Sequence, residues 1–257
     1  MTLNRKNWTK FFQPQSLPIW MCPKCMEYPL ILADAHSFKS YLTVESQADQ
    51  YYQHHCPMDD SYTYHATLIC SDKNCKKLVI TTGEGFVDLY VDDSSGNVET
   101  KYEVYYQPKY FNPSLDIFPL PEQTPPVLAK AIRKSFELFF TDSNASLNQL
   151  RSAVETLLNE LGVERNDKNG HPLKLHSRLD KLKDDNAKYR ESLKAIKWLG
   201  NAGSHSTCST KVKLEDVLDG YEILQPILYE LFRNKERTTE ELVSAINANK
   251  GPIKRSA

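Results

Sequence analysis

The pattern of apolar and polar residues divides the chain into two parts. Up to about residue 120, apolar residues alternate with polar ones, as in the runs 86–91 and 102–106, and aromatic and β-branched side chains are frequent. This alternation is typical of strands that bury one face. The turn-forming residues 92–97 between those two runs predict a hairpin.

After Pro126 the apolar residues recur every three or four positions, which is the period of an amphipathic helix. The second stripe is followed by Gly162, a residue that commonly ends helices. A short last helix is expected to start at Thr238 and to end near Gly251. The main stripes cover residues 128–139, 147–161, 175–182, 189–199 and 217–232. Helices with short loops predict an antiparallel bundle, so the fold class is α+β.

A proline-dense segment separates the two parts. Six prolines fall within nineteen residues: Pro108, Pro113, Pro119, Pro121, Pro125 and Pro126. Such a segment is expected to be extended and semi-rigid. At about 150 residues per domain, the 257 residues fit two domains. We therefore predict a β-rich domain over residues 1–120 and a helical domain over residues 121–257.

The N-terminal part contains two close pairs of cysteines, Cys22 with Cys25 and Cys70 with Cys75. Both spacings let the sulfurs of a pair turn toward one point, and four thiolates form a closed tetrahedral zinc site. Strand-like residues flank the second pair, so the pattern predicts a zinc ribbon with cysteines at hairpin tips. Binding of structural zinc releases about 10–16 kcal/mol, enough to fold a small β-module. Four bound sulfurs leave no open position, which argues against catalysis by this zinc.

Other cysteines and histidines offer alternatives to this ligand set. His54, His55 and Cys56 lie in the long insert between the two pairs, and one of them could replace a cysteine. The competing interpretation is a polar loop with a buried thiol. Cys208 is expected to be an unpaired thiol.

Charge restricts the possible partners. The net charge of −1 comes from 32 basic and 33 acidic residues, so any binding of nucleic acid must be local. The stretch from Lys168 to Lys197 is the richest in basic residues, and a solvated helical face is the simpler explanation for it. Residues 1–8 contain no apolar core for a signal peptide, and no apolar run reaches membrane-spanning length. We therefore expect a cytoplasmic protein, where reduced thiols favour metal binding over disulfides.

Two short segments, 151–155 on the second helix and 200–205 after the fourth, carry a family resemblance. Together with residues 115–119, which lead into the helical part, they resemble the prokaryotic domain-of-unknown-function family 4145, a HEPN-like helical domain. The resemblance covers about residues 115–235. Members of that family often carry an N-terminal zinc ribbon, so the resemblance implies a zinc ribbon followed by an antiparallel HEPN-like bundle.

The resemblance also implies a possible active site. In catalytic HEPN proteins an Arg-Asn-x-x-x-His segment cuts RNA without metal, commonly across a dimer interface, with histidine as acid or base and arginine stabilising phosphate charge. Asn201 and His205 match this segment, whereas Gly200 stands where the arginine should be. Losing such an electrostatic stabiliser typically lowers the rate by about two or three powers of ten. Arg151 and Lys197 are candidates to supply the missing charge.

Each of these residues also has a purely structural interpretation. Arg151 can form an ion pair with Glu155 one turn later, and Lys197 can be an exposed helix residue. Gly200 and Asn201 tolerate the left-handed conformation that ends a helix, so they can mark the end of the fourth helix. His205 would then hydrogen-bond the turn or a neighbouring helix.

Three functions follow from these observations. The first is a non-catalytic interaction module that dimerises or binds a partner protein, and the resemblance implies a setting in prokaryotic defence against phage or plasmids. The second is a metal-independent ribonuclease that uses His205 and Asn201 with a borrowed basic residue such as Arg151. The third is binding of RNA or DNA without cleavage, which would depend steeply on salt.

Overall fold

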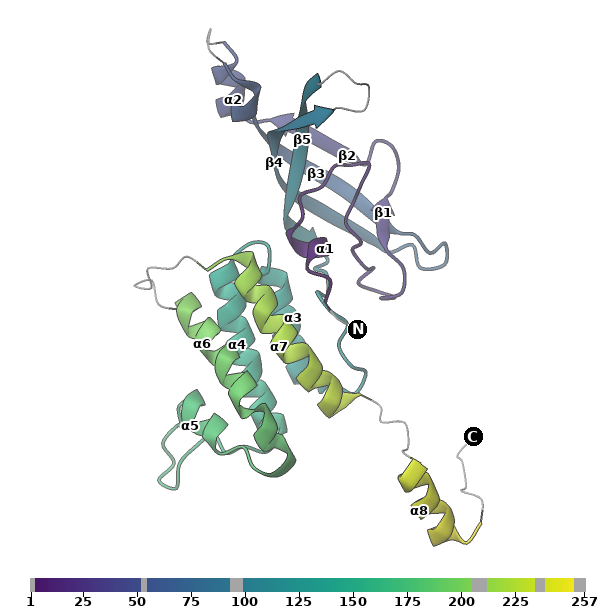
Figure 1. The fold of residues 1–257 in the computed structure, drawn as a ribbon, viewed down its shortest axis with the longest axis vertical. Helices are drawn as coiled ribbons and strands as arrows, with labels where there is room; N and C mark the ends of the chain where they lie inside the picture. The colour runs from purple at the N-terminus through teal and green to yellow at the C-terminus, as the bar shows by residue number, and fades with distance from the viewer. Residues whose placement is uncertain (1–2, 52–54, 93–98, 205–211, 234–238, 252–257) are drawn as a thin grey trace.

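The computed structural model describes residues 3–51, 55–92, 99–204, 212–233 and 239–251. An N-terminal curled antiparallel sheet is followed by C-terminal helices, and the two parts lie end to end along the long axis of the molecule (Figure 1). This arrangement confirms the predicted α+β class. None of the helices in the described ranges is both long and apolar enough to cross a membrane.

All strands of the sheet pair antiparallel. The main order is β1-β3-β4-β5, and β2 pairs with β3 beside β1. The strands are β1 (Leu30–Leu32), β2 (Phe38–Leu42), β3 (Ser61–Cys70), β4 (Leu78–Asp92) and β5 (Glu99–Asn112). The short helix α1 (Lys6–Thr9) precedes the sheet, while α2 (Val44–Asp49) and η1 (Pro57–Asp59) connect β2 to β3.

The alternation seen in the sequence determines which face of the sheet is buried. On β3, Tyr64, Ala66 and Leu68 are buried, while the residues between them face outward. The N-terminal segment covers this face with Phe12, whose ring centroid lies 5.6 Å from that of Tyr64 and 5.3 Å from that of Trp20. The outcome is a core rich in edge-to-face aromatic contacts.

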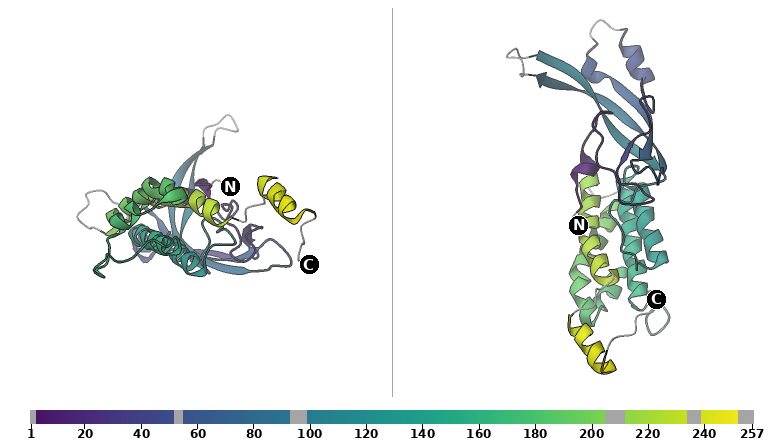
Figure 2. Two further views of the ribbon diagram at one scale, coloured as in Figure 1. Left: turned by 90° about the horizontal axis from the view of Figure 1, so that it is seen from below. Right: turned by 90° about the vertical axis from the view of Figure 1, so that its right-hand side faces the viewer.

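The helical part is built around α4, which contacts α3, α6 and α7. The helices are α3 (Pro126–Leu138), α4 (Ser143–Glu160), α5 (Leu175–Asp180), α6 (Arg190–Ser204), α7 (Leu214–Phe232) and α8 (Thr239–Asn249), with the short η2 (Asp184–Tyr189) before α6. Asp142 caps α4 by accepting from the backbone N–H of Ala145 at 2.9 Å. Gly162 follows α4 with φ of +71°, as its sequence position predicts. Figure 2 shows α3, α4, α6 and α7 side by side.

The N-terminal segment and the proline-rich connector join the two parts. Trp8 packs against Phe139, with ring centroids 6.1 Å apart, and Arg5 forms ion pairs with Asp219 and Glu222 of α7. Within the connector, the side chain of Phe118 is buried with a ring centroid 5.1 Å from that of Phe136. The buried apolar residues of both parts therefore form one continuous core.

Candidate functional site

The four predicted cysteines come from two loops at one end of the sheet. Cys22 and Cys25 lie in a loop closed by the pairing of Met21 with Pro29. Cys70 is the last residue of β3, and Cys75 lies in the connection from β3 to β4. The two pairs therefore occupy hairpin ends, as the strand-like flanks predict.

The four sulfur atoms converge. The Sγ atoms of Cys22 and Cys75 lie 3.7 Å apart, and those of Cys25 and Cys70 also lie 3.7 Å apart. All four sulfurs lie within 4.8 Å of one another. Metal–sulfur bonds of about 2.3 Å in a tetrahedron place the sulfurs roughly 3.8 Å apart. The cluster thus has the dimensions of a four-thiolate metal site and could hold a metal ion.

A left-handed residue follows the second cysteine of each pair. Met26 has φ of +56° and Lys76 has φ of +47°. Each turn is closed by a backbone hydrogen bond, from Met26 N–H to the carbonyl of Cys22 at 2.9 Å and from Lys76 N–H to that of Asp72 at 3.2 Å. No sequence signal marks these positions, because methionine and lysine rarely adopt this conformation.

Burial and backbone dipoles act differently on the thiols. Burial raises the pKa of Cys70 to about 12 and also raises the pKa of Cys22. The backbone N–H groups of Glu27 and Tyr28 lower the pKa of Cys25 to about 7. The loop of the first pair therefore stabilises a thiolate at Cys25, whereas the buried thiols need a cation to stay deprotonated.

The two alternative ligands that the structure describes, His55 and Cys56, lie away from the cysteine cluster. His55 Nε2 lies 2.9 Å from the carboxylate of Asp60, immediately before β3, whereas Cys70 ends that ten-residue strand. At about 3.3 Å per residue, the two ends are roughly 30 Å apart. Cys56 neighbours His55 and lies at the same end. His54 and Cys208 are outside the described residues.

Gly200 and Asn201 lie inside α6, so their interpretation as a helix end is wrong. The helix continues to Ser204, and it crosses α4 closely at Gly200 and Gly203. A Cβ added at Gly200 would lie 2.5 Å from Cβ of Arg151, and one at Gly203 would lie 2.7 Å from the carbonyl oxygen of Asn144. Tertiary packing, not a cap, explains both glycines.

The three candidate catalytic residues are only partly brought together. Arg151 lies directly beside Gly200, and its Nη2 bonds Glu155 at 3.2 Å, as its structural interpretation predicts. Its buried Nε has no hydrogen-bond partner among the described residues. Asn201 is partly buried on α6. His205 lies outside the described residues.

Lys197 is buried, which contradicts its interpretation as an exposed helix residue. Its Nζ lies 3.3 Å from the ring centroid of Trp198, so the aromatic face stabilises the ammonium group. An isolated lysine in an amphipathic stripe gave no sequence signal for this contact.

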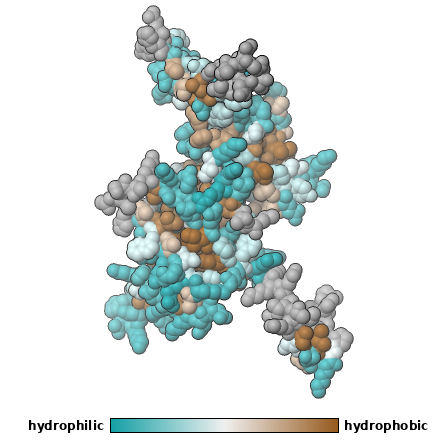
Figure 3. All heavy atoms as spheres, viewed as in Figure 1, coloured by the Kyte–Doolittle hydropathy of each residue, from teal (hydrophilic) through white to brown (hydrophobic). Residues whose placement is uncertain are grey.

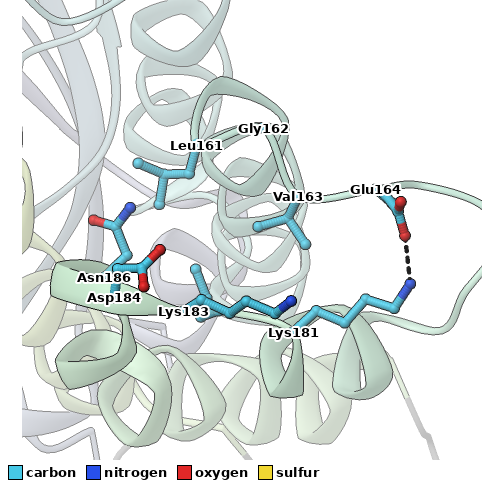
Figure 4. Close-up of a pocket in the computed structure, with 9 residues that line it drawn as sticks. Leu161, Gly162, Val163, Glu164, Lys181, Lys183, Asp184 and Asn186 are labelled. Atoms are coloured by element: carbon cyan, nitrogen blue, oxygen red, sulfur yellow. Dashed lines mark hydrogen bonds and ion pairs between the residues drawn. The ribbon is translucent and has the colours of Figure 1, made fainter.

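A polar pocket of about 380 Å³ lies between the end of α4 and the turn from α5 to η2 (Figure 4). Lys181 donates to Glu164 at 2.7 Å at its rim. Lys183 and Asp184 contribute one further charge of each sign. The charges balance, so this pocket has no net field that would select an anion or a cation.

Two family models match this chain. Residues 10–111 match a family described as Domain of unknown function (DUF8608), and residues 133–249 match one described as Domain of unknown function (DUF4145). The first match contains the four clustered cysteines, and the second contains Arg151, Gly200 and Asn201. No curated protein and no solved structure matches the chain.

Proposed function

We propose that this protein is a non-catalytic interaction module in which a structural zinc ion stabilises a partner-binding sheet that is joined to a HEPN-like helical bundle. The observation that carries the proposal is a two-stranded arm formed by the far ends of β4 and β5. The pairing of β3 with β4 ends at the pair Ser61 and Phe86, while β4 continues to Asp92 paired with β5. The right-hand view of Figure 2 shows this arm extending beyond the other strands.

One face of the arm is apolar and exposed. Leu89 pairs directly with Tyr102, and their exposed fractions are 43% and 52%. The same face begins at the pair Val87 and Val104, which are largely buried near the sheet. A two-stranded ribbon is only marginally stable in water without a further packing surface. A protein that covers Leu89 and Tyr102 would supply that surface.

The other face of the arm indicates the charge of the partner. Asp88 pairs directly with Glu103 across the two strands. Like charges in opposite positions destabilise a strand pair by up to about 1 kcal/mol. Hydrogen bonds from Gln13 and Tyr105 to the Glu103 carboxylate, at 2.9 and 3.0 Å, already offset part of this repulsion. Basic side chains of a partner would offset the rest, whereas nucleic acid would add to it. The arm therefore suits a protein that covers Leu89 and Tyr102 on one face and reaches around the ribbon with basic side chains to the other face.

The proposed metal has a structural role. Four thiolates in a tetrahedral arrangement favour zinc, and the ligands Cys22, Cys25, Cys70 and Cys75 would fill its coordination sphere. The bound ion would tie the loop of the first pair to the β3–β4 connection. The resemblance to family 4145 supports placing the module in a prokaryotic anti-phage or anti-plasmid system.

Binding by arm variants tests the proposal. Crosslinking in cells of the source organism identifies the partner, and the purified pair is then titrated with wild type and with the double variant Leu89→Ser and Tyr102→Ser. We expect the arm variant to bind about tenfold or more weakly, and salt to weaken binding by the wild type. Val127→Ser, on an exposed position of α3, is the matched control. Equal binding by arm variant and wild type would refute the proposed surface.

A metal-independent ribonuclease remains the second candidate because Arg151 occupies the space beside Gly200. Its side chain lies where a residue at position 200 would project, so Arg151 can stand in for the motif arginine. RNA cleavage by the purified wild type that is lost in both Arg151→Gln and His205→Ala would establish this activity. The same activity in both variants would point to a contaminating nuclease.

Nucleic-acid binding without cleavage has less support. Three lysines of the basic stretch lie in ion pairs: Lys181 with Glu164, Lys188 with Glu230, and Lys194 with Asp180 and Glu191 at 3.0 and 3.1 Å. Arg178 is buried and donates to the carbonyl of Val163 at 3.0 Å. Titration with RNA and DNA at low salt tests this function.

A further inference from the structure

An open apolar groove runs between α6 and α7. It has a volume of about 700 Å³ and is lined mainly by Ala195, Trp198, Leu199, Ala202 and Ile223. Figure 3 shows this apolar patch on the face of the bundle. Trp198 is 58% exposed in it, an unusual state for the largest apolar side chain.

Helix α8 carries an apolar surface of its own. Val243 and Ile246 lie three residues apart, hence on one face of the helix, and are 51% and 42% exposed. Figure 1 places α8 apart from the other helices. An isolated helix of eleven residues is marginal in water, so α8 requires a packing partner to stay folded.

The family comparison connects α8 with the bundle. The match to DUF4145 covers residues 133–249, and α8 ends at Asn249. The helix therefore falls within the same matched unit as α4, α6 and α7. A tail without a role in the domain would not be expected inside the match.

We propose that α8 docks into the α6–α7 groove of its own chain and covers Trp198 with Val243 and Ile246. Ile223 lies nine residues before the end of α7, which corresponds to about 14 Å of helix. Six residues separate Phe232 from Thr239, and an extended chain of this length reaches about 20 Å. The groove is therefore within reach of an α8 that runs antiparallel to α7.

Because the connection is short, the groove is filled by α8 of the same chain in preference to α8 of a second copy. A short tether raises the local concentration of the attached helix to roughly the millimolar range. A second copy at micromolar concentration competes poorly with it. Asp219 and Glu222 at the far end of the groove already pair with Arg5, so the docking rests on apolar contact and not on charge.

Tryptophan quenching tests this docking in the full chain. Trp8 and Trp20 are buried, so acrylamide quenching reports mainly on Trp198, and Trp198→Phe measures the remaining signal. We expect low quenching in the wild type and at least a doubling of the quenching constant in the double variant Val243→Ser and Ile246→Ser. Ala248→Ser, on the opposite face of α8, is the matched control and should behave as wild type.

A second variant changes the groove and leaves α8 intact. Ala202→Glu places a charge in the groove and should release α8, giving the same rise in quenching without any change in α8. Strong quenching of Trp198 in the wild type, unchanged by these variants, would overturn the proposal. Protection that grows with protein concentration, together with a doubled mass in light scattering, would also overturn it in favour of a second copy.

Discussion

Gly200 on α6 lies directly against Arg151 on α4. A Cβ added at position 200 would lie 2.5 Å from Cβ of Arg151 and 3.0 Å from the carbonyl oxygen of Leu147. Both distances are shorter than ordinary van der Waals contacts. The helix crossing thus requires a glycine at position 200, and an arginine at this position would displace α4.

Gly200→Ala is expected to destabilise the helical part. Within a helix, glycine to alanine normally stabilises by about 1 kcal/mol, but overpacking typically costs about 1–3 kcal/mol. Because the nearest atoms belong to Cβ and to the backbone, we expect a net loss of roughly 1–2 kcal/mol. Urea unfolding monitored by circular dichroism measures this loss.

The partner substitution Arg151→Gly provides the control. It removes the Cβ that the added methyl group at position 200 would meet. The Gly200→Ala substitution should therefore cost less in this background, with a coupling of about 1 kcal/mol or more. Additive effects of the two substitutions would show that the contact between residues 200 and 151 does not determine how closely α4 and α6 approach each other.

Cys70→Ser is expected to abolish metal binding at the proposed site and unfold the sheet. Cys70 is buried and supplies one of the four converging sulfurs, so its loss leaves an incomplete site and a buried hydroxyl. Cys56→Ser is the matched control because that thiol lies at the opposite end of β3. Metal content by mass spectrometry and near-ultraviolet circular dichroism measure both effects. Equal metal content in Cys70→Ser and wild type would contradict the proposed ligand set.

Regular periodicity made much of the fold predictable. The stripe that contains Leu147, Leu150 and Val154 is buried along its whole length, and the alternation on β3 assigns Tyr64 and Leu68 to the core. The cysteine pairs were predictable for a related reason, because short spacing forces the sulfurs of a pair together. These signals are local. Each predicts burial or cysteine pairing from a short stretch of sequence, without knowledge of the neighbouring elements.

Features that depend on contacts between distant segments were not predictable. Gly200 carries the sequence signal of a helix end, but the closeness of α4 decides its role. The first residues, which bind the helical part through Arg5 and Trp8, have no pattern that would assign them to it.

Acid is expected to weaken the contact of Arg5 with α7. Hydrogen bonds from Arg5 lower the pKa of Glu222 below its usual value of about 4.5. Its contribution to stability is therefore complete above that value and is lost as the pH falls through the lower pKa of the folded state. Both side chains are more than a third exposed, so we expect only about 0.5–1 kcal/mol.

The comparison of wild type with Arg5→Gln measures the joint contribution of the pairs that Arg5 forms with Glu222 and Asp219. Both proteins share the cysteine cluster, so any acid-induced loss of metal cancels in the difference between their unfolding free energies. The difference should be constant near neutral pH and should shrink below about pH 4.5. A difference that stays unchanged down to about pH 3 would show that Glu222 does not respond to Arg5.

Trp8→Ala is expected to uncouple the sheet from the helices. Trp8 is buried against Phe139 and Phe140, with ring centroids 6.1 and 6.2 Å away. Removing a buried tryptophan costs about 3–5 kcal/mol, and here the loss falls at the junction of the two parts. We expect wild type to unfold in one transition and Trp8→Ala in two, by calorimetry. Phe11→Ala, an exposed aromatic three residues later, is the control and should retain a single transition. One shared transition in Trp8→Ala would mean that the remaining contacts, among them Phe111 with Phe140 at 5.4 Å and Arg5 with α7, suffice to couple the two parts.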